Sequence, residues 1–200
     1  MKILNQDQIN EAASILKDGG LIAFPTETVF GLGVIFDNKD SYNRLIKVKR
    51  RPPEKPFTLM LSDLDQISDF AFVDERAEKL ITKFMPGQFT IILKAKDTLP
   101  DYCVSKEGNV GIRIPDSNLI RGLIRKVSKP LLVPSANKSG ETPLTNSNDV
   151  VSIFADEIDA VISGKSISNI PSTIVMVGED VKIIREGQIK NEDVLKALGE

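Results

Sequence analysis

The 200-residue chain contains no histidine and no tryptophan, and its one cysteine is Cys103. The lack of histidine excludes Ser-His-Asp and Cys-His nucleophiles and any zinc site that needs imidazole. A single cysteine excludes an internal disulfide bond, which makes the cytoplasm the expected compartment. No apolar run approaches the roughly 20 residues of a membrane span, and the first residues lack the layout of a signal peptide, so no membrane association is expected. The remaining lysine, arginine, carboxylate, hydroxyl and amide groups suit anion binding better than covalent catalysis.

The pattern of apolar residues predicts an α/β fold. Strands are expected at 21–24, 34–36, 57–61, 89–95, 110–114, 131–134, 160–162, 172–177 and 181–186. Helices are expected at 6–18, 39–48, 63–70, 74–84, 116–128, 147–154 and 191–198. The length suffices for a single domain, residues 1–200, with a sizeable core. Strands alternate with helices at first and cluster later, which indicates one open, twisted, mixed sheet with flanking helices.

The segment "KVKRRPPEKP", residues 47–56, concentrates positive charge in a chain whose formal net charge is −2. It lies between a predicted helix and a predicted strand, so it is expected to be a loop, and its three prolines restrict the backbone. A solvated charged run is the ordinary interpretation of such a segment. A stiff cationic loop is also what a polyphosphate pocket requires, because arginine offers a bidentate fork and lysine a point charge. We expect Lys49 and Arg51 to be exposed when no ligand is bound.

Two polar segments each follow a predicted buried strand. They are "FPTETVFGLG", residues 24–33, and "VPSANKSGETPLT", residues 133–145. Hydroxyl, amide and glycine residues at the carboxyl end of a strand are a common ligand position in α/β sheets. Neither segment contains a Walker A or G-x-G-x-x-G pattern. Taken singly, the first is more simply a tight turn into a short helix capped by Thr26, and the second a turn of ordinary Ser/Asn/Gly chemistry.

Arg113 interrupts the apolar strand "VGIRIP", residues 110–115. Strand alternation places its side chain opposite those of Ile112 and Ile114, either on a solvated face or lining a cleft. An arginine without a partner is costly to enclose, so an anion is expected to face Arg113 when the site is occupied.

Seven motifs, in this order and spacing, closely resemble the YrdC-type threonylcarbamoyl-AMP synthases. They are "FPTETVFGLG", "KRRPPEKP", "MPGQFTIIL", "VGIRIP", "PSANKSGETPLT", "PSTIV" and "IIREG". The resemblance extends over nearly the whole chain, and its K-x-R and S-x-N pair, here Lys49–Arg51 and Ser135–Asn137, is specific to the family. It implies an open, twisted α/β sheet around a large concave, positively charged cavity.

The resemblance also implies a nucleotidyltransferase that converts L-threonine, bicarbonate and ATP to threonylcarbamoyl-adenylate and pyrophosphate, the first step of N6-threonylcarbamoyladenosine modification of tRNA. The residues it assigns to ATP are Lys49, Arg51, Ser135, Asn137, Thr145 and Arg185, with Lys49 and Arg51 also catalytic. The residues it assigns to threonine are Thr26, Phe30, Arg113 and Ser172. No tight carboxylate cluster is evident, so Mg²⁺ is expected to be carried by the nucleotide. The implied partners are the downstream tRNA threonylcarbamoyl transferase complex and tRNA or double-stranded RNA.

The chain departs from the synthase pattern in two places. Phe30 stands where the family often has tyrosine, and "FTLMLSDLDQISDFAFVD", residues 57–74, is similar to the YciO-type paralogues, which have no settled function. Those paralogues generally lack the complete K-x-R and S-x-N pair, and because both are intact here we favour the synthase. The alternatives are an RNA-binding module and a YciO-like paralogue without synthase activity. An isoelectric point near 5.4 and the lack of an RRM or KH motif argue against the RNA-binding module.

Overall fold

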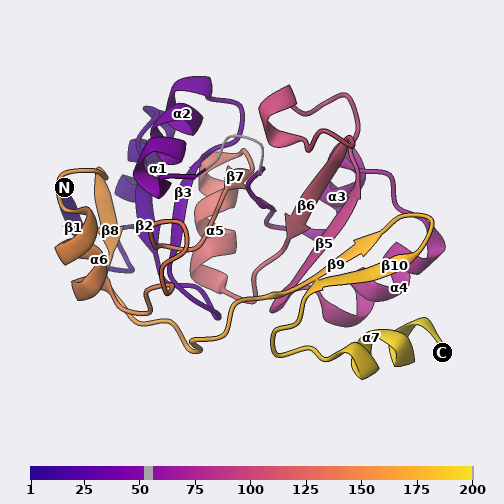
Figure 1. Ribbon diagram of the computed structural model, residues 1–200. Helices are drawn as coiled ribbons and strands as arrows, with labels where there is room; N and C mark the ends of the chain where they lie inside the picture. The colour runs from indigo at the N-terminus through magenta and orange to yellow at the C-terminus, as the bar shows by residue number, and fades with distance from the viewer. Residues whose placement is uncertain (52–55, 200) are drawn as a thin grey trace.

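The computed structural model describes residues 1–51 and 56–199, and within them ten strands form one mixed sheet (Figure 1). The strand order across the sheet is β1-β8-β2-β3-β7-β4-β6-β5-β9-β10. The strands are β1 (Lys2–Leu4), β2 (Ile22–Phe24), β3 (Gly31–Ile35), β4 (Leu59–Met60), β5 (Phe89–Lys94), β6 (Asn109–Arg113), β7 (Leu131–Leu132), β8 (Ala160–Ile162), β9 (Thr173–Val177) and β10 (Val181–Arg185). Antiparallel pairs such as β5–β6 occur beside parallel pairs such as β5–β9, and the predicted fold class is confirmed.

Helices flank this sheet along its whole length. They are α1 (Ile9–Lys17), α2 (Lys39–Lys49), α3 (Ile67–Phe70), α4 (Glu75–Phe84), α5 (Asn118–Val127), α6 (Ser147–Phe154) and α7 (Asn191–Leu198), with 3-10 turns η1 (Leu64–Gln66) and η2 (Asp101–Cys103). In Figure 1 the N-terminus lies at the end of the sheet that carries β1 and β8, and the C-terminus lies beyond α7 at the other end. No helix of the described part of the chain is long and apolar enough to cross a membrane.

Three local features differ from the sequence prediction. Strand β1 is not predicted from the sequence. It has only three residues, too few to show an alternation of apolar and polar side chains, and it is held by parallel pairing with β8, far away in the sequence. The predicted helix at 63–70 consists of two pieces, η1 and α3. The predicted turn from Thr26 into a short helix is wrong, because residues 25–30 form a loop that leads into β3, antiparallel to β2.

The two faces of the sheet are covered unequally. On one face, α1 and α5 pack against β2 and β7 in a cluster that includes Leu16, Phe24, Leu123 and Leu131. On the opposite face, α2, α4 and α6 pack in a larger cluster that runs along the whole sheet. The face that carries α1 and α5 is left open beyond α5, where alternate residues of β5, β6 and β9 line cavities: Thr90, Ile92, Gly111, Arg113, Ile174 and Met176.

Candidate functional site

The open face of the sheet carries a cavity of about 150 Å³. Its charged and hydroxyl lining residues come from distant parts of the sequence: Arg51, Thr58, Thr90, Arg113, Ser135, Ser172 and Arg185. Three of them are arginines, and none of the described residues that line the cavity is acidic. Low-dielectric walls strengthen the field of such a cluster, so the cavity suits an anionic ligand.

A second, less polar cavity of about 410 Å³ adjoins the first. The two share Arg51, Phe57, Thr58, Thr90 and Ile174, among others. The second cavity continues along the same sheet face over the apolar side chains of Ile92, Met176 and Ile184. The open face therefore places a cationic compartment beside a largely apolar one, whose lining also includes Glu107, and Arg51 lines both.

Lys49, the last residue of α2, lies behind the wall of the first cavity. It is only 2% exposed, so the expectation that it would be exposed is wrong. Its Nζ donates to the carbonyl oxygens of Ser135 and Asn137, both at 2.7 Å, and to Oδ1 of Asn137 at 2.9 Å. Burial, together with the positive charge of Arg51, lowers the pKa of Lys49 to about 8. The ammonium group thus joins the end of α2 to the loop after β7.

The two residues of the S-x-N motif are bonded to each other. Ser135 Oγ donates to Oδ1 of Asn137 at 2.6 Å. Nδ2 of Asn137 donates to the carbonyl oxygens of Lys138 and Glu141, both at 2.8 Å. Ser135 lines the first cavity, whereas Asn137 is buried behind it beside Lys49.

Arg51 reaches both cavities from the end of α2. Arg50 caps that helix in the left-handed conformation, with φ of 50°, and so turns the chain out of the helix just before Arg51. The Arg51 guanidinium lies 5.1 Å from the centroid of the Phe57 ring, and its Nη2 donates to the carbonyl oxygen of Pro56 at 3.1 Å. The predicted stiffness of this loop depends on Pro52 and Pro53, which lie outside the described residues.

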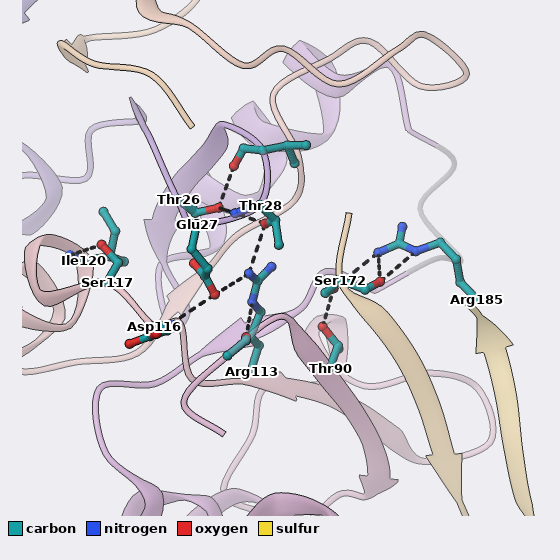
Figure 2. Close-up of polar contacts among 12 residues, drawn as sticks. Thr26, Glu27, Thr28, Thr90, Arg113, Asp116, Ser117, Ile120, Ser172 and Arg185 are labelled. Atoms are coloured by element: carbon teal, nitrogen blue, oxygen red, sulfur yellow. Dashed lines mark hydrogen bonds and ion pairs between the residues drawn. The ribbon is translucent and has the colours of Figure 1, made fainter. Parts of the chain in front are cut away.

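Arg113 faces a buried carboxylate that sequence analysis did not identify (Figure 2). Its Nη2 donates to Oε1 of Glu27 at 2.7 Å and to Oγ1 of Thr28 at 3.0 Å, and its Nε donates to the carbonyl oxygen of Gly87 at 3.2 Å. Oε1 of Glu27 also accepts the backbone N–H of Asp116, whereas its Oε2 is buried with no hydrogen-bond partner among the described residues. Strand alternation is confirmed, because Arg113 lines the cavity while its neighbouring isoleucines lie in the core of the other face.

Arg185 and Ser172 meet at the opposite side of the cavity (Figure 2). A register shift in β10 between Ile183 and Arg185 re-aims the arginine side chain, as bulges beside binding sites often do. Nε and Nη2 of Arg185 donate to the carbonyl oxygen of Ser172 at 3.1 and 2.8 Å. The hydroxyl of Ser172 is hydrogen-bonded to that of Thr90 at 2.8 Å. Gly187 is required beside them, because a Cβ atom there would lie 2.4 Å from the carbonyl oxygen of Pro171.

Five of the ten sequence-predicted site residues do not line this cavity, namely Thr26, Phe30, Lys49, Asn137 and Thr145. Phe30 is fully buried in the core, and Thr26 is buried in the loop after β2, where its Oγ1 accepts the N–H of Thr28 and donates to the carbonyl oxygen of Val29. Thr145 lines a separate hollow beside Gln88. The structure brings together Arg51, Arg113, Ser135, Ser172 and Arg185, with Lys49 and Asn137 directly behind them.

Sequence reasoning missed Glu27 and Thr90. Glu27 lies between two threonines in "FPTETVF", directly after a buried strand, and a carboxylate in so apolar a segment is the signal that could have identified it. Thr90 is a polar residue in the apolar strand "FTIILKA", where alternation places it opposite Ile91.

Comparison with known proteins assigns a family to this architecture. The model of the Sua5/YciO/YrdC family, described as "Telomere recombination", matches residues 14–187. The threonylcarbamoyl-AMP synthase of Bacillus subtilis is 33% identical over 199 residues, which are 98% of this chain and 58% of that protein. The chain therefore spans less than two thirds of the length of this relative.

Two crystal structures are similar over almost all of the chain. Sua5 of Pyrococcus abyssi in complex with L-threonine superimposes with a TM-score of 0.94 and 29% identity, over 100% of this chain and 62% of that one. E. coli YciO superimposes with a TM-score of 0.88 and 26% identity, over 98% of this chain and 97% of that one. The fold is thus shared with a threonine-binding protein that is longer and with a YciO protein of the same length.

Proposed function

The chain belongs to the Sua5/YciO/YrdC family, and on that premise we propose that it is a threonylcarbamoyl-AMP synthase. In this reaction L-threonine, bicarbonate and ATP yield threonylcarbamoyl-adenylate and pyrophosphate. The observation that carries the proposal is the pair of joined cavities, one lined by three arginines and the other largely apolar. A nucleoside triphosphate has the same division between an anionic and an apolar part.

Each compartment has a role in this proposal. The phosphates lie in the first cavity, where Arg51 and Arg185 offset their charge. The base and ribose extend over Ile92 and Met176 in the second cavity. Threonine lies near Ser172 and Arg113, whose Nη1 makes no hydrogen bond within the described residues. The binding of L-threonine by Pyrococcus abyssi Sua5 supports this part of the proposal.

The chemistry needs no covalent enzyme intermediate. The neutral threonine amine adds carbon dioxide and releases a proton, or condenses with bicarbonate and releases water, to give a carbamate. A carbamate oxygen then attacks the α-phosphorus of ATP as pyrophosphate leaves in line. The protein contributes proximity and charge stabilisation, with Arg51 and Arg185 on the departing phosphates. No three metal-binding side chains cluster among the described residues, and phosphate oxygens are the ligands that Mg²⁺ prefers, so within this proposal the ion enters with the nucleotide.

The product also determines the expected partners. Threonylcarbamoyl-adenylate is a reactive mixed anhydride that water hydrolyses. A tRNA threonylcarbamoyl transferase therefore has to take it up before it is hydrolysed. The proposed reaction therefore takes place in the cytoplasm, where tRNA and ATP are available, and tRNA or double-stranded RNA is a further candidate partner.

A pyrophosphate-release assay with single-substrate omissions tests the synthase. Release is expected only when threonine, bicarbonate and ATP are all present. Arg185→Met is expected to lower the rate by about 10²–10³-fold, because it removes a charge-stabilising group. Lys79→Met, on α4 at the opposite face of the sheet, serves as the control and is expected to keep the wild-type rate. Pyrophosphate release without threonine contradicts the assignment.

A second candidate is a YciO-like protein without synthase activity. Residues 57–74, which are similar to the YciO-type paralogues, and the superposition on E. coli YciO with a TM-score of 0.88 favour this alternative. It predicts no threonine-dependent release of pyrophosphate under any combination of substrates, so the same assay distinguishes the two.

A further inference from the structure

We propose that the hydroxyl of Ser135 is fixed as a hydrogen-bond acceptor toward the cavity and therefore recognises a hydrogen-bond donor of the substrate, not a phosphate oxygen. Lys49 acts as a positioning residue that sets this polarity through Asn137. The inference rests on the proposed function for the identity of the substrates. The polarity of Ser135, meaning that its hydroxyl accepts and does not donate toward the cavity, follows from the hydrogen bonds behind the cavity wall.

The orientation of the Asn137 amide is the first step. Its Nδ2 donates to the carbonyl oxygens of Lys138 and Glu141, both at 2.8 Å. Its Oδ1 faces Nζ of Lys49 at 2.9 Å. The flipped amide would set Oδ1 against two carbonyl oxygens and Nδ2 against an ammonium group, so only one orientation satisfies every contact.

Lys49 is the second step. An ammonium group has three N–H donors, and those of Lys49 have three protein acceptors: two carbonyl oxygens and Oδ1 of Asn137. No N–H is left over for a ligand in this arrangement. The charge of Lys49 still contributes to the field in the cavity, but its hydrogen bonds all serve to hold the loop.

The hydroxyl of Ser135 is the third step. Its Oγ lies 2.6 Å from Oδ1 of Asn137, an atom that can only accept, so the hydroxyl proton must lie between the two oxygens. The lone pairs of Oγ then remain for the cavity, which Ser135 lines. A phosphate oxygen placed there would meet lone pairs and be repelled, whereas an O–H or N–H group would be accepted.

The neighbours of Ser135 make this acceptor distinctive. Arg51, Arg113 and Arg185 line the same cavity and can only donate. The hydroxyl of Ser172 already contacts Thr90 Oγ1 and Nη2 of Arg185. ATP and threonine offer several such donors, namely the ribose hydroxyls and the adenine amine of ATP and the amine and hydroxyl of threonine. The arginines would thus bind phosphates and carboxylates while Ser135 recognises one of these donors.

Calorimetric titration of wild type and Ser135→Ala tests the polarity. The ligands are ATP, 2′-deoxy-ATP, 3′-deoxy-ATP and inorganic tripolyphosphate, and, with a non-hydrolysable ATP analogue present, threonine and 2-aminobutyrate. Ser135→Ala is expected to lower the binding affinity for ATP or for threonine by about two- to tenfold, because it removes one neutral hydrogen bond. Tripolyphosphate, which has no such donor when ionised, is expected to bind both proteins equally.

The analogues identify the donor. If it is a ribose hydroxyl, one deoxynucleotide binds wild type as weakly as ATP binds Ser135→Ala, and the substitution weakens that analogue no further. If it is the adenine amine, Ser135→Ala lowers the affinity for ATP and for both deoxynucleotides by the same factor. If it is on threonine, the nucleotide affinities are unaffected and Ser135→Ala lowers the affinity for threonine. If Ser135→Ala loses affinity for threonine but not for 2-aminobutyrate, the donor is the threonine hydroxyl. If it loses the same affinity for both, the donor is the amine. Weaker tripolyphosphate binding by Ser135→Ala overturns the proposal, as does unchanged affinity for every ligand.

The role of Asn137 is tested by selectivity and not by affinity alone. Asn137→Ala frees the Ser135 proton to turn toward the cavity, so the preference for the donor-bearing ligand over its analogue is expected to disappear. Ser139→Ala, an exposed position in the same loop, is the matched control and is expected to keep the preference. A preference that survives Asn137→Ala overturns the positioning role.

The two proposals fail separately. Nucleotide and threonine binding with the expected selectivity but without pyrophosphate release contradicts the synthase and leaves the polarity of Ser135 intact. If wild type binds neither ATP nor threonine, both proposals are overturned, because Ser135 then has no substrate donor to recognise.

Discussion

The two buried cations of the site, Lys49 and Arg113, are held in opposite ways. Within residues 1–51 and 56–199, the ammonium of Lys49 contacts only neutral acceptors, namely two carbonyl oxygens and the amide oxygen of Asn137. The guanidinium of Arg113 is paired with the carboxylate of Glu27, and both side chains are less than a tenth exposed. Among the described residues Lys49 has no carboxylate within ion-pair distance, although Glu141 acts on it from farther away, whereas the charge of Arg113 is neutralised by Glu27. The charge of Lys49 is unbalanced in this sense.

This difference separates charge from hydrogen bonding in the cavity. Lys49 contributes positive charge but no N–H that lacks an acceptor. The N–H groups on Nη1 of Arg113 have no acceptor among the described residues, and the charge of Arg113 is already balanced by Glu27. The attraction for a polyphosphate then comes from Lys49, Arg51 and Arg185. Arg113 suits local recognition of a smaller group, where geometry matters more than net charge.

The largest effect is expected from Lys49→Met, which removes the unbalanced charge. It leaves the carbonyl oxygens of Ser135 and Asn137 buried without their donor, at a cost of about 1–3 kcal/mol each, so the free energy of unfolding should fall by about 4 kcal/mol. Tripolyphosphate affinity should fall about tenfold or more, because a charge near the phosphates is lost. Urea denaturation and calorimetry measure the two effects.

Lys47→Met is the matched control for this change. Lys47 lies on the same helix but is exposed, so its replacement is expected to alter stability by no more than about 0.5 kcal/mol. A Lys49→Met protein as stable as the Lys47→Met protein would mean that the buried ammonium does not hold the loop. An exposed Lys49, as expected from the sequence, would also have given that result.

Glu27→Gln is expected to have a smaller effect, which lowers stability but raises tripolyphosphate affinity. It leaves Arg113, like Lys49, without a carboxylate partner. The glutamine keeps an acceptor for Nη2 but removes the balancing charge, so stability should fall by about 3 kcal/mol. The cavity gains one net positive charge, so tripolyphosphate affinity should rise a few-fold. Glu75→Gln, which breaks an exposed ion pair with Lys79, is the control and should change stability by less than about 1 kcal/mol. Weaker tripolyphosphate binding by Glu27→Gln would contradict the charge balance described here.

The same comparison shows what could be predicted from the sequence. Local patterns predicted the α-helices and the strands other than β1, and strand alternation predicted that Arg113 and the neighbouring isoleucines lie on opposite faces. The burial of Lys49 could not be predicted, because it depends on how α2 packs against a loop more than 80 residues later in the chain. Glu27 was missed for the same reason, since its partner Arg113 is 86 residues away.

The family resemblance added what local patterns lack. It selected the residues that converge on the cavity, including Ser135, Ser172 and Arg185, although these come from three different loops and strands. It did not distinguish residues in the cavity wall from residues behind it, because a motif preserves spacing and not burial. Their roles toward ATP and threonine stay predictions until the titrations are done.

The smallest effect is the proton linkage of Lys49. Burial and the nearby charge of Arg51 lower its pKa from 10.5 to about 8. A bound polyphosphate favours the charged form, so ATP binding near pH 8 should take up about half a proton, and affinity should fall as the pH rises above about 8. The terminal phosphate of ATP, with a pKa of about 6 to 7, is already ionised there and contributes little.

Stability should change in the other direction over the same range. Between about pH 8 and 10.5 the unfolded chain keeps the Lys49 proton that the folded protein has lost, so the unfolded state binds more protons and stability contributed by this group rises with pH. Calorimetry in buffers of different ionisation enthalpy measures the proton uptake, and urea denaturation at several pH values measures the stability. Lys49→Met is the reference for both, because it has no group to titrate and should show neither trend. Equal proton uptake by wild type and Lys49→Met would assign the titration to another group, and would remove the distinction between an unbalanced Lys49 and a balanced Arg113.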